Sequence, residues 1–206
     1  MSGVAAGGRG GAACDHGRVT RIVAGVAGGR RLQVPPRGTR PTSDRVREAL
    51  FSSLEALIDL DGARVLDLYA GSGALGFEAL SRGAVSAVFV ESDKRAADVL
   101  RANARALGLP GATVVNRSAE SAVADPADQP CDVVFADPPY AVTDEQLGLV
   151  LDGLVRHGWF ADGALAIVER AARSPEPIWP GALESLRSKR YGDTALYWAE
   201  YRGALG

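Results

Sequence analysis

Short apolar runs alternate with amphipathic stretches through the middle of the chain. Apolar runs rich in β-branched residues indicate buried strands, and apolar residues three or four positions apart indicate helices that bury one face. The predicted strands span residues 65–69, 87–90, 112–116, 131–136 and 163–168, and the predicted helices span residues 74–81, 93–107 and 143–155. Because strands alternate with helices, we expect a parallel sheet with right-handed crossover connections.

The two ends of the chain depart from this alternation. Within residues 20–34, two β-favouring runs flank Gly28 and Gly29, which is typical of a hairpin. The proline-containing residues 35–41 then predict an extended connection. At the other end, residues 186–191 and 194–201 flank a Gly-Asp pair and predict a second hairpin. The sheet should therefore finish in an antiparallel pair of strands.

A helix should follow the first connection, capped by Thr42 or Ser43. Val46, Leu50, Leu54 and Leu57 form its expected buried stripe, and Arg45 and Arg47 lie off that stripe. We expect three parts in all: a Gly/Ala-rich tail over residues 1–19, a hairpin-and-helix extension over residues 20–60, and one α/β domain over residues 61–206. The tail should be disordered because it has little apolar surface to bury, and we hypothesise that the native chain starts near residue 19.

Composition narrows the class of protein. The chain has 206 residues, 47% of them apolar, and no apolar run long enough to span a membrane. Two cysteines and two isolated histidines offer neither a disulfide framework nor a metal site, so we expect a metal-free, monomeric protein of the reducing cytoplasm.

Charge is distributed unevenly along the chain. Residues 1–48 contain nine arginines and three acidic residues, a net charge of +6, whereas the remaining residues carry −8. A basic arm on an acidic domain is either a docking surface for a polyanion or a solvated face, and the charge count alone leaves both open.

A glycine-rich turn follows the first predicted strand of the domain. Gly71-Ser-Gly73-Ala-Leu-Gly76 matches the nucleotide-binding pattern G-x-G-x-x-G, and Glu91 lies 20 residues after Gly71, where an acceptor for ribose hydroxyls is expected. Both features suit a nicotinamide, a flavin or S-adenosylmethionine. Asp67, near the exit of the strand, would repel a pyrophosphate and attract a cationic amino group. It favours the sulfonium cofactor.

The fourth predicted strand runs into Asp137-Pro138-Pro139-Tyr140. A tyrosine ring can stack on a planar base, while a carboxylate and a fixed backbone carbonyl accept the two hydrogens of its exocyclic amine. Alone, this motif could be a tight turn with a packing tyrosine. Behind a strand and downstream of Asp67 and Glu91, it indicates methyl transfer to an amine.

These residues together resemble an RNA-methyltransferase family that modifies the N2 atom of a guanine in bacterial 16S ribosomal RNA. The most specific part of the resemblance is segment 40–51, Arg-Pro-Thr-Ser-Asp-Arg-Val-Arg-Glu-Ala-Leu-Phe. Segments 21–25, 29–32, 67–76, 89–92 and 137–140 complete it, so that it covers residues 20–201. The family implies a Rossmann-like, seven-stranded class I methyltransferase sheet, S-adenosyl-L-methionine as cofactor, and 16S rRNA in the assembled small subunit as substrate.

The resemblance also implies roles for individual residues. The expected catalytic residues are Asp137, Pro138 and Tyr140. The expected cofactor-binding residues are Asp67, Tyr69, Gly71, Gly73, Glu91, Ser92, Ser118 and Ala119. The expected rRNA-binding residues are Arg21, Arg30, Arg31, Arg40, Arg45 and Arg47. Glu169, at the end of the fifth predicted strand, could be functional or could form a structural pair with an arginine.

Three other functions use the same motifs. An adenine-N6 or protein-glutamine methyltransferase would hold its amine similarly, although a DNA enzyme would need a further recognition domain and the glutamine type would be expected to carry Asn at position 137. An NAD-dependent oxidoreductase would need a hydride-relay residue, and neither lysine of the chain follows a tyrosine by four positions. A non-catalytic RNA-binding module would not need intact carboxylates at positions 67, 91 and 137.

Overall fold

The computed structural model describes residues 19–35 and 43–203. Residues 1–18 of the predicted tail, most of the proline-containing connection, and Arg40 lie outside these ranges, whereas Val19, the last residue of that predicted tail, is the first residue of a strand. Within them, none of the helices is long and apolar enough to cross a lipid bilayer.

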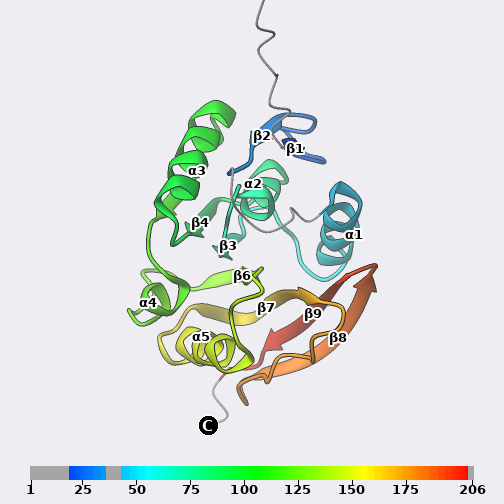
Figure 1. The fold of residues 1–206 in the computed structure, drawn as a ribbon, viewed down its shortest axis with the longest axis vertical. Helices are drawn as coiled ribbons and strands as arrows, with labels where there is room; N and C mark the ends of the chain where they lie inside the picture. The colour runs from blue at the N-terminus through cyan, green and yellow to red at the C-terminus, as the bar shows by residue number, and fades with distance from the viewer. Residues whose placement is uncertain (1–18, 36–42, 204–206) are drawn as a thin grey trace, which may run out of the picture.

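Seven strands form one sheet in the order β5-β4-β3-β6-β7-β9-β8 (Figure 1). They are β3 (Arg64–Leu68), β4 (Ser86–Val90), β5 (Ala112–Val115), β6 (Cys131–Ala136), β7 (Phe160–Ala171), β8 (Leu183–Tyr191) and β9 (Thr194–Tyr201). The first five strands of this order pair in parallel, and β9 runs antiparallel to both of its neighbours. The prediction of a mostly parallel sheet that ends in an antiparallel hairpin is confirmed.

Helices cover both faces of the sheet. Figure 1 shows α1 (Asp44–Glu55), α2 (Ala74–Ser81) and α3 (Lys94–Leu107) on one face, with α4 (Ala119–Val123) and α5 (Asp144–Arg156) on the other. Two apolar clusters, one beneath each set of helices, form the core. The short helix α4 was not predicted, because five residues are too few to show a helical periodicity of apolar positions.

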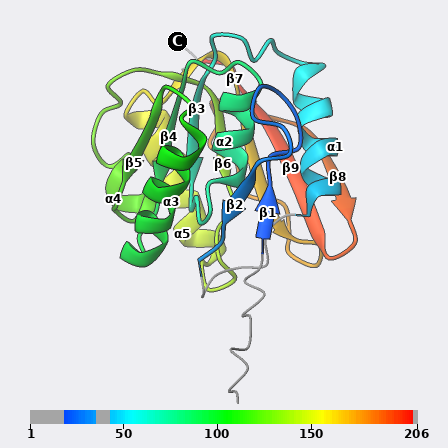
Figure 2. The same cartoon turned by 90° about the horizontal axis from the view of Figure 1, so that it is seen from above.

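The N-terminal extension packs against the outside of α2. Strands β1 (Val19–Arg21) and β2 (Arg31–Gln33) form the predicted antiparallel hairpin, and Figure 2 shows it in front of α2, between α1 and α3. Ile22 and Leu32 of the hairpin are fully buried in the apolar cluster that lies beneath α1, α2 and α3. The extension therefore shares a hydrophobic core with the sheet.

Helix α1 begins as predicted, and one part of its predicted stripe is wrong. The Oγ atom of Ser43 accepts the backbone N–H of Val46 at 3.3 Å, which makes Ser43 the N-cap. Leu50 and Leu54 are buried as expected. Leu57 is 46% exposed because the helix ends at Glu55, so residue 57 no longer follows the helical period.

The strand order places a topological switch point between β3 and β6. From β3 the chain continues to β4 and β5 on one side, and then crosses to β6 and β7 on the other. In open α/β sheets, ligands bind in the crevice outside the carboxyl ends of the strands at such a point. Both predicted motifs, the glycine turn after β3 and the segment 137–140 after β6, lie there.

Candidate active site

The turn after β3 has an unusual backbone. Tyr69, Gly71 and Gly73 have φ values of 58°, 55° and 80°, in the left-handed region. A Cβ atom on Gly71 would have only the Tyr69 carbonyl oxygen nearby, at 3.9 Å, whereas one on Gly73 would lie 2.5 Å from the ring of Phe77. Gly73 is also the N-cap of α2 and, as a glycine, has no side chain to accept a hydrogen bond from the first turn of the helix. The turn therefore leaves space above Gly71 beside the positively polarised N-terminal end of the helix.

Asp67 lies beneath this turn and is almost fully buried, with 2% of its surface exposed. Its Oδ2 atom accepts the backbone N–H of Gly76 at 2.9 Å. Burial is the main cause that raises the pKa of Asp67 to about 7; the charge of Glu91 raises it further, and the bond from Gly76 opposes the shift. Among the described residues, no basic side chain forms an ion pair with Asp67. A buried carboxylate in this state would be stabilised by a cationic ligand.

Glu91 follows β4 and braces the same turn. Its two carboxylate oxygens accept the backbone N–H groups of Gly71, at 2.9 Å, and of Asp93, at 2.8 Å. The side-chain amide of Asn116, after β5, donates to the backbone carbonyls of Glu91 and Ser92 at 2.8 and 3.0 Å. Each carboxylate oxygen can accept a second hydrogen bond, so Glu91 can hold the turn and still receive hydroxyl groups of a ligand.

The remaining predicted cofactor residues also reach this edge of the sheet. Ser118 is the N-cap of α4, where its Oγ atom accepts the backbone N–H of Ser121 at 3.2 Å, and Ala119 is buried in the first turn. The hydroxyl of Tyr69 is buried and has no hydrogen-bond partner among the described residues. Burial, and then the charge of Glu120, raise the pKa of Tyr69 above its ordinary value. The ends of β3, β4 and β5 thus bring the predicted cofactor-binding residues together.

A cleft of about 320 Å³ opens beside Asp137. Its walls come from the ends of β6 and β7, the tip of the β8–β9 hairpin and the beginning of α1. The lining residues are Ser43, Val46, 137–140, 169–171, Ser174 and 191–194. Tyr140 is 77% exposed, so its ring is accessible at this cleft, whereas Pro138 is buried.

Sequence reasoning identified only part of this cleft. It left the role of Glu169 open and interpreted residues 190–194 as a turn at the sheet edge. The strand pattern could have placed Glu169 near Asp137, because consecutive parallel strands such as β6 and β7 bring their carboxyl ends to the same edge of the sheet. No pattern in the sequence could place the hairpin tip against them.

Asp137 and Glu169 lie side by side at the ends of neighbouring strands. Ala136 is in register with Val168, so Asp137, the residue after β6, lies next to Glu169 of β7. Burial chiefly, then the charges of Glu169 and Asp67, raise the pKa of Asp137 well above its ordinary value. A carboxyl group with a raised pKa at the mouth of a cleft is suited to accept a proton.

Four of the predicted RNA-binding arginines are exposed, and they fall into three groups. Arg31 and Arg45 are exposed, and neither has a hydrogen-bond or ion-pair partner among the described residues. Arg21 is exposed and pairs with Asp44 at 2.8 Å. Arg30 donates to the backbone carbonyls of residues 106 and 107, at the carboxyl end of α3.

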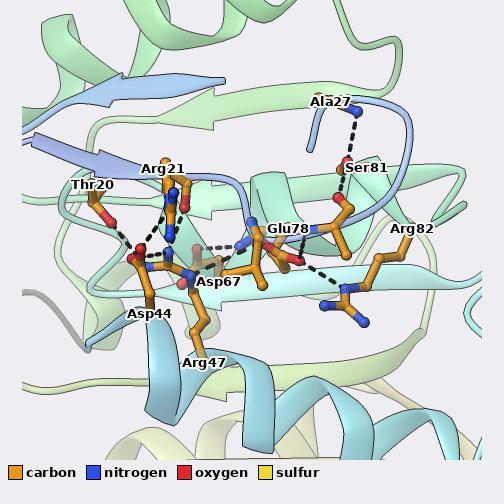
Figure 3. Close-up of polar contacts among 12 residues, drawn as sticks. Thr20, Arg21, Ala27, Asp44, Arg47, Asp67, Glu78, Ser81 and Arg82 are labelled. Carbon is orange, nitrogen blue, oxygen red and sulfur yellow. Dashed lines mark hydrogen bonds and ion pairs between the residues drawn. The ribbon is translucent and has the colours of Figure 1, made fainter. Parts of the chain in front are cut away.

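Arg47 was expected on the surface, and that expectation is wrong. Its side chain is fully buried and donates to Oγ1 of Thr20 at 3.0 Å, to the carbonyl of Arg21, and to Oδ1 of Asp44 at 2.8 Å (Figure 3). Its Nε atom lies 4.0 Å from Oε2 of Glu78. A guanidinium enclosed in this way cannot reach an RNA phosphate. Arg47 instead joins α1 to β1.

Glu78 of α2 is the acidic centre of this buried cluster (Figure 3). Its carboxylate accepts the backbone N–H groups of Val23 and Ala24, at 2.6 and 3.0 Å, and the Nε atom of Arg82 at 2.8 Å. The Oγ atom of Ser81, one helical turn on, donates to the carbonyl of Ala24 and accepts the N–H of Ala27. These bonds fix the hairpin to α2, the helix that begins directly after the glycine turn at residues 69–73, here called the cofactor turn.

Comparison with known proteins agrees with this geometry. A family model described as "Conserved hypothetical protein 95" matches residues 20–200. The chain is 42% identical over 188 residues to the ribosomal RNA small subunit methyltransferase D of Escherichia coli (strain K12), which covers 89% of this chain and 91% of that protein. It is 41% identical over 159 residues to the protein of the same name from Haemophilus influenzae, over 75% of this chain and 80% of that protein.

A solved structure gives the same result for the fold. The structure of yhhF from Escherichia coli, whose name proposes a methyltransferase, superposes with a TM-score of 0.79 at 38% identity and covers 90% of this chain and 99% of that one. The prediction of a class I methyltransferase sheet is therefore confirmed. The chain therefore belongs to the Conserved hypothetical protein 95 family, together with the ribosomal RNA small subunit methyltransferase D proteins.

Proposed function

We propose that this protein transfers a methyl group from S-adenosylmethionine to the exocyclic N2 amine of a guanine in 16S rRNA, and that it acts as a cytoplasmic monomer on the assembled small ribosomal subunit. The observation that carries the proposal is the position of Asp137. It lies near the buried carboxyl group of Asp67, whose ionised form a cation would stabilise, and it lines the cleft beside the exposed ring of Tyr140. The names of the family's relatives support ribosomal RNA as the substrate.

The residues at the ends of β3 and β4 fit S-adenosylmethionine better than a dinucleotide. Asp67 and Glu91 are both acidic, and Glu91 contributes to the raised pKa of Asp67. A pyrophosphate placed over the turn would add negative charge to this pair, whereas an amino group would remove the electrostatic cost of ionising Asp67. S-adenosylmethionine supplies an electrophilic methyl group on a sulfonium ion. Glu91 would hold its ribose hydroxyls and Asp67 its amino group.

The segment 137–140 would position the acceptor amine. The exocyclic amine of guanine is a poor nucleophile because its lone pair is delocalised into the ring. Asp137 and the carbonyl of Pro138 would each accept one of its hydrogens, which favours a pyramidal nitrogen, while the ring of Tyr140 stacks on the base. Asp137, whose pKa is raised, would then take the proton that the methylated amine releases.

The N-terminal extension would dock the RNA. Ser43 and Val46 of α1 line the cleft, so that the exposed Arg45 lies close in sequence to the base site. Arg31 and Arg45 would bind phosphates, because no ion pair with a described residue occupies them. The extension thus keeps its proposed RNA-docking role, which we assign to the exposed Arg31 and Arg45 and no longer to Arg47.

The decisive experiment is methyl transfer from labelled S-adenosylmethionine to three substrates: undermethylated small subunits, naked 16S rRNA and duplex DNA. Mass spectrometry of the nucleosides would identify the product. We expect N2-methylguanosine on the subunits. N6-methyladenosine would support the rival adenine enzyme, and no transfer to any of the three substrates, with the cofactor bound, would remove the substrate assignment.

Charge reversal at Arg31 and Arg45 tests the docking surface. Because each phosphate contact releases condensed counterions, Arg31→Glu and Arg45→Glu should weaken subunit binding and together flatten the slope of log affinity against log salt by about 1 to 2. Filter binding at several salt concentrations would measure this slope. Arg101→Glu, on α3 and paired with Asp98, is the charge-matched control. An unchanged slope in the double variant would show that the extension does not bind RNA.

A further inference from the structure

Two carboxyl groups occupy the cleft, and the proposed chemistry uses only one of them. Asp137 directly follows β6 and Glu169 lies beside it on β7, because Ala136 and Val168 are in register. Both residues line the cleft. Adjacent strands lie about 4.8 Å apart, a distance that the flexible side chain of a glutamate can shorten towards a neighbouring hydrogen-bonding group of the same base. The second carboxyl group is thus positioned to contact the same base as the first.

We propose that Glu169 selects guanine by accepting the hydrogen of its N1 atom, while Asp137 holds the neighbouring N2 amine. This inference rests on the proposed function and adds to it the residue that distinguishes guanine from other bases. Guanine presents N1–H and N2–H groups next to each other on its Watson–Crick edge. A pair of acceptors matches that edge, since an ionised carboxylate can only accept hydrogen bonds. At the N1 atom of adenine there is an acceptor, which a carboxylate would repel.

The strand order supports this division of roles. The cofactor turn follows β3, Asp137 follows β6, and Glu169 lies on β7, and the three strands are neighbours in that order. A base whose amine points towards the cofactor would therefore present its adjacent N1–H group on the side of β7. Glu169 is farther from the turn than Asp137 and is not placed to bind the cofactor itself.

The surroundings of Glu169 hold it in the cleft. The Oγ1 atom of Thr194, at the hairpin tip, donates to its Oε1 atom at 3.4 Å. The next residue on β7, Arg170, directs its guanidinium to Asp144 on α5, with an N–O distance of 2.7 Å. The charge of Glu169 also contributes to the raised pKa of Asp137, as expected for two carboxyl groups that face one small space.

The first test needs only the wild-type protein. The nucleotide that the protein methylates on small subunits is located by mass spectrometry, and 2-aminopurine is placed at that position by ligation of synthetic RNA before the subunit is reconstituted. This base retains the exocyclic amine and has an acceptor in place of N1–H. We expect kcat/KM for guanine to exceed that for 2-aminopurine by about 10- to 100-fold. Equal rates on the two bases would overturn the inference.

The variant Glu169→Gln provides the second test. Glutamine can donate to the N1 acceptor of 2-aminopurine and lacks the charge that strengthens a bond from guanine, so the preference should shrink to within about threefold. Comparing the ratio between the two proteins cancels any difference in the reactivity of the two amines. Glu145→Gln, an exposed change on α5, should keep the wild-type ratio.

The two proposals fail in distinguishable ways. If the wild-type protein forms no N2-methylguanosine, the proposed function fails before Glu169 is tested. If guanine is methylated and Glu169→Gln keeps the wild-type preference, the selection role alone is wrong. Calorimetric binding of S-adenosylmethionine to Glu169→Gln should match wild type within about twofold, and a larger loss would show that Glu169 serves the cofactor site.

Discussion

The cofactor turn and the N-terminal extension use their charged residues in opposite ways. In the turn, the carboxylates of Asp67 and Glu91 accept the backbone N–H groups of Gly76 and Gly71, and we propose that both also bind the cofactor. In the extension, Arg47 is enclosed by contacts with Thr20, Arg21 and Asp44. The same signal in the sequence, a charged residue beside a motif, belongs to the proposed ligand site in the first region and to an internal support in the second.

One buried residue connects the two regions. The side-chain amide of Asn103, on α3, donates to the carbonyl of Gln33 in β2 and to that of Ser72 in the cofactor turn, at 2.9 and 3.0 Å. Its Oδ1 atom accepts the N–H of Gln33 at 2.9 Å. The side chain of Asn103 therefore links the extension to the cofactor turn by hydrogen bonds. Because the extension helps to hold the cofactor turn, we expect its buried part to be rigid, while its exposed arginines remain available to bind RNA phosphates.

Removing the proposed catalytic carboxylate should give the largest effect. Asp137→Ala should lower methyl transfer to small subunits by about three orders of magnitude or more, because the amine loses both its orientation and its proton acceptor. Affinity for S-adenosylmethionine should stay within a few-fold of wild type. Single-turnover transfer of labelled methyl groups and calorimetry would measure the two quantities on the same preparation.

One result of these measurements would contradict the proposal that Asp137 holds the amine. If Asp137→Ala lost cofactor binding and transfer in equal proportion, Asp137 would belong to the cofactor pocket and would not hold the amine. Asp152→Ala, an exposed change on α5 that removes only a surface ion pair, is the control for an acidic residue outside the site.

The difference between the two regions also explains how much the sequence could reveal. The turn after β3 was predictable because its requirements are local: the strand, the left-handed glycines and the helix are contiguous, and Glu91 follows at a characteristic spacing. The mostly parallel sheet was predictable for the same reason, since the periods of strands and helices are properties of short segments.

Contacts between distant segments were not predictable in this way. Arg47 lies off the apolar stripe of α1, so the helical pattern predicts an exposed side chain. It is buried because β1 and Glu78 of α2, which are distant from it in the sequence, pack against it. The approach of the hairpin tip 191–194 to Asp137 likewise depends on the order of β7, β9 and β8 in the sheet. Residue type and spacing can nominate a charged residue for a function, but they do not show which surface it faces.

Replacing the buried arginine should destabilise the protein without a direct effect on RNA binding. Arg47→Met leaves the oxygen of Thr20 and the carbonyl of Arg21 without their donor and takes one cation from Glu78. We expect a loss of about 2–4 kcal/mol in the free energy of unfolding, since Arg82 still pairs with Glu78. Urea denaturation followed by circular dichroism would measure it.

The matched variant is Arg45→Met, two positions away on the exposed face of the same helix. It should change the free energy of unfolding by less than about 0.5 kcal/mol while it weakens subunit binding. If the two variants behaved alike in stability and in binding, the division between supporting and docking arginines would be wrong.

The smallest expected effect is a pH dependence of cofactor affinity that originates at Asp67. Its pKa of about 7 in the folded protein lies above the ordinary value of 3.8, so the folded state binds this proton more tightly than the unfolded chain. The group therefore contributes stability below about pH 4 that is lost as the pH rises towards 7. A cationic amino group would favour the ionised form. Affinity for S-adenosylmethionine should then rise about tenfold between pH 6 and pH 7.5, with release of a proton.

Asp67→Asn should remove this dependence, because asparagine can still accept the N–H of Gly76 and does not titrate. Calorimetry in two buffers with different enthalpies of ionisation would count the proton released by the wild-type protein. The window ends at pH 7.5 because a free α-amino group, with a pKa of about 7.7 to 8.0, loses most of its charge over the next pH unit. A flat profile in the wild-type protein, or an equal slope in Asp67→Asn, would mean that the buried carboxylate braces the turn in the way that Arg47 braces α1, and that the two regions differ less than their geometry indicates.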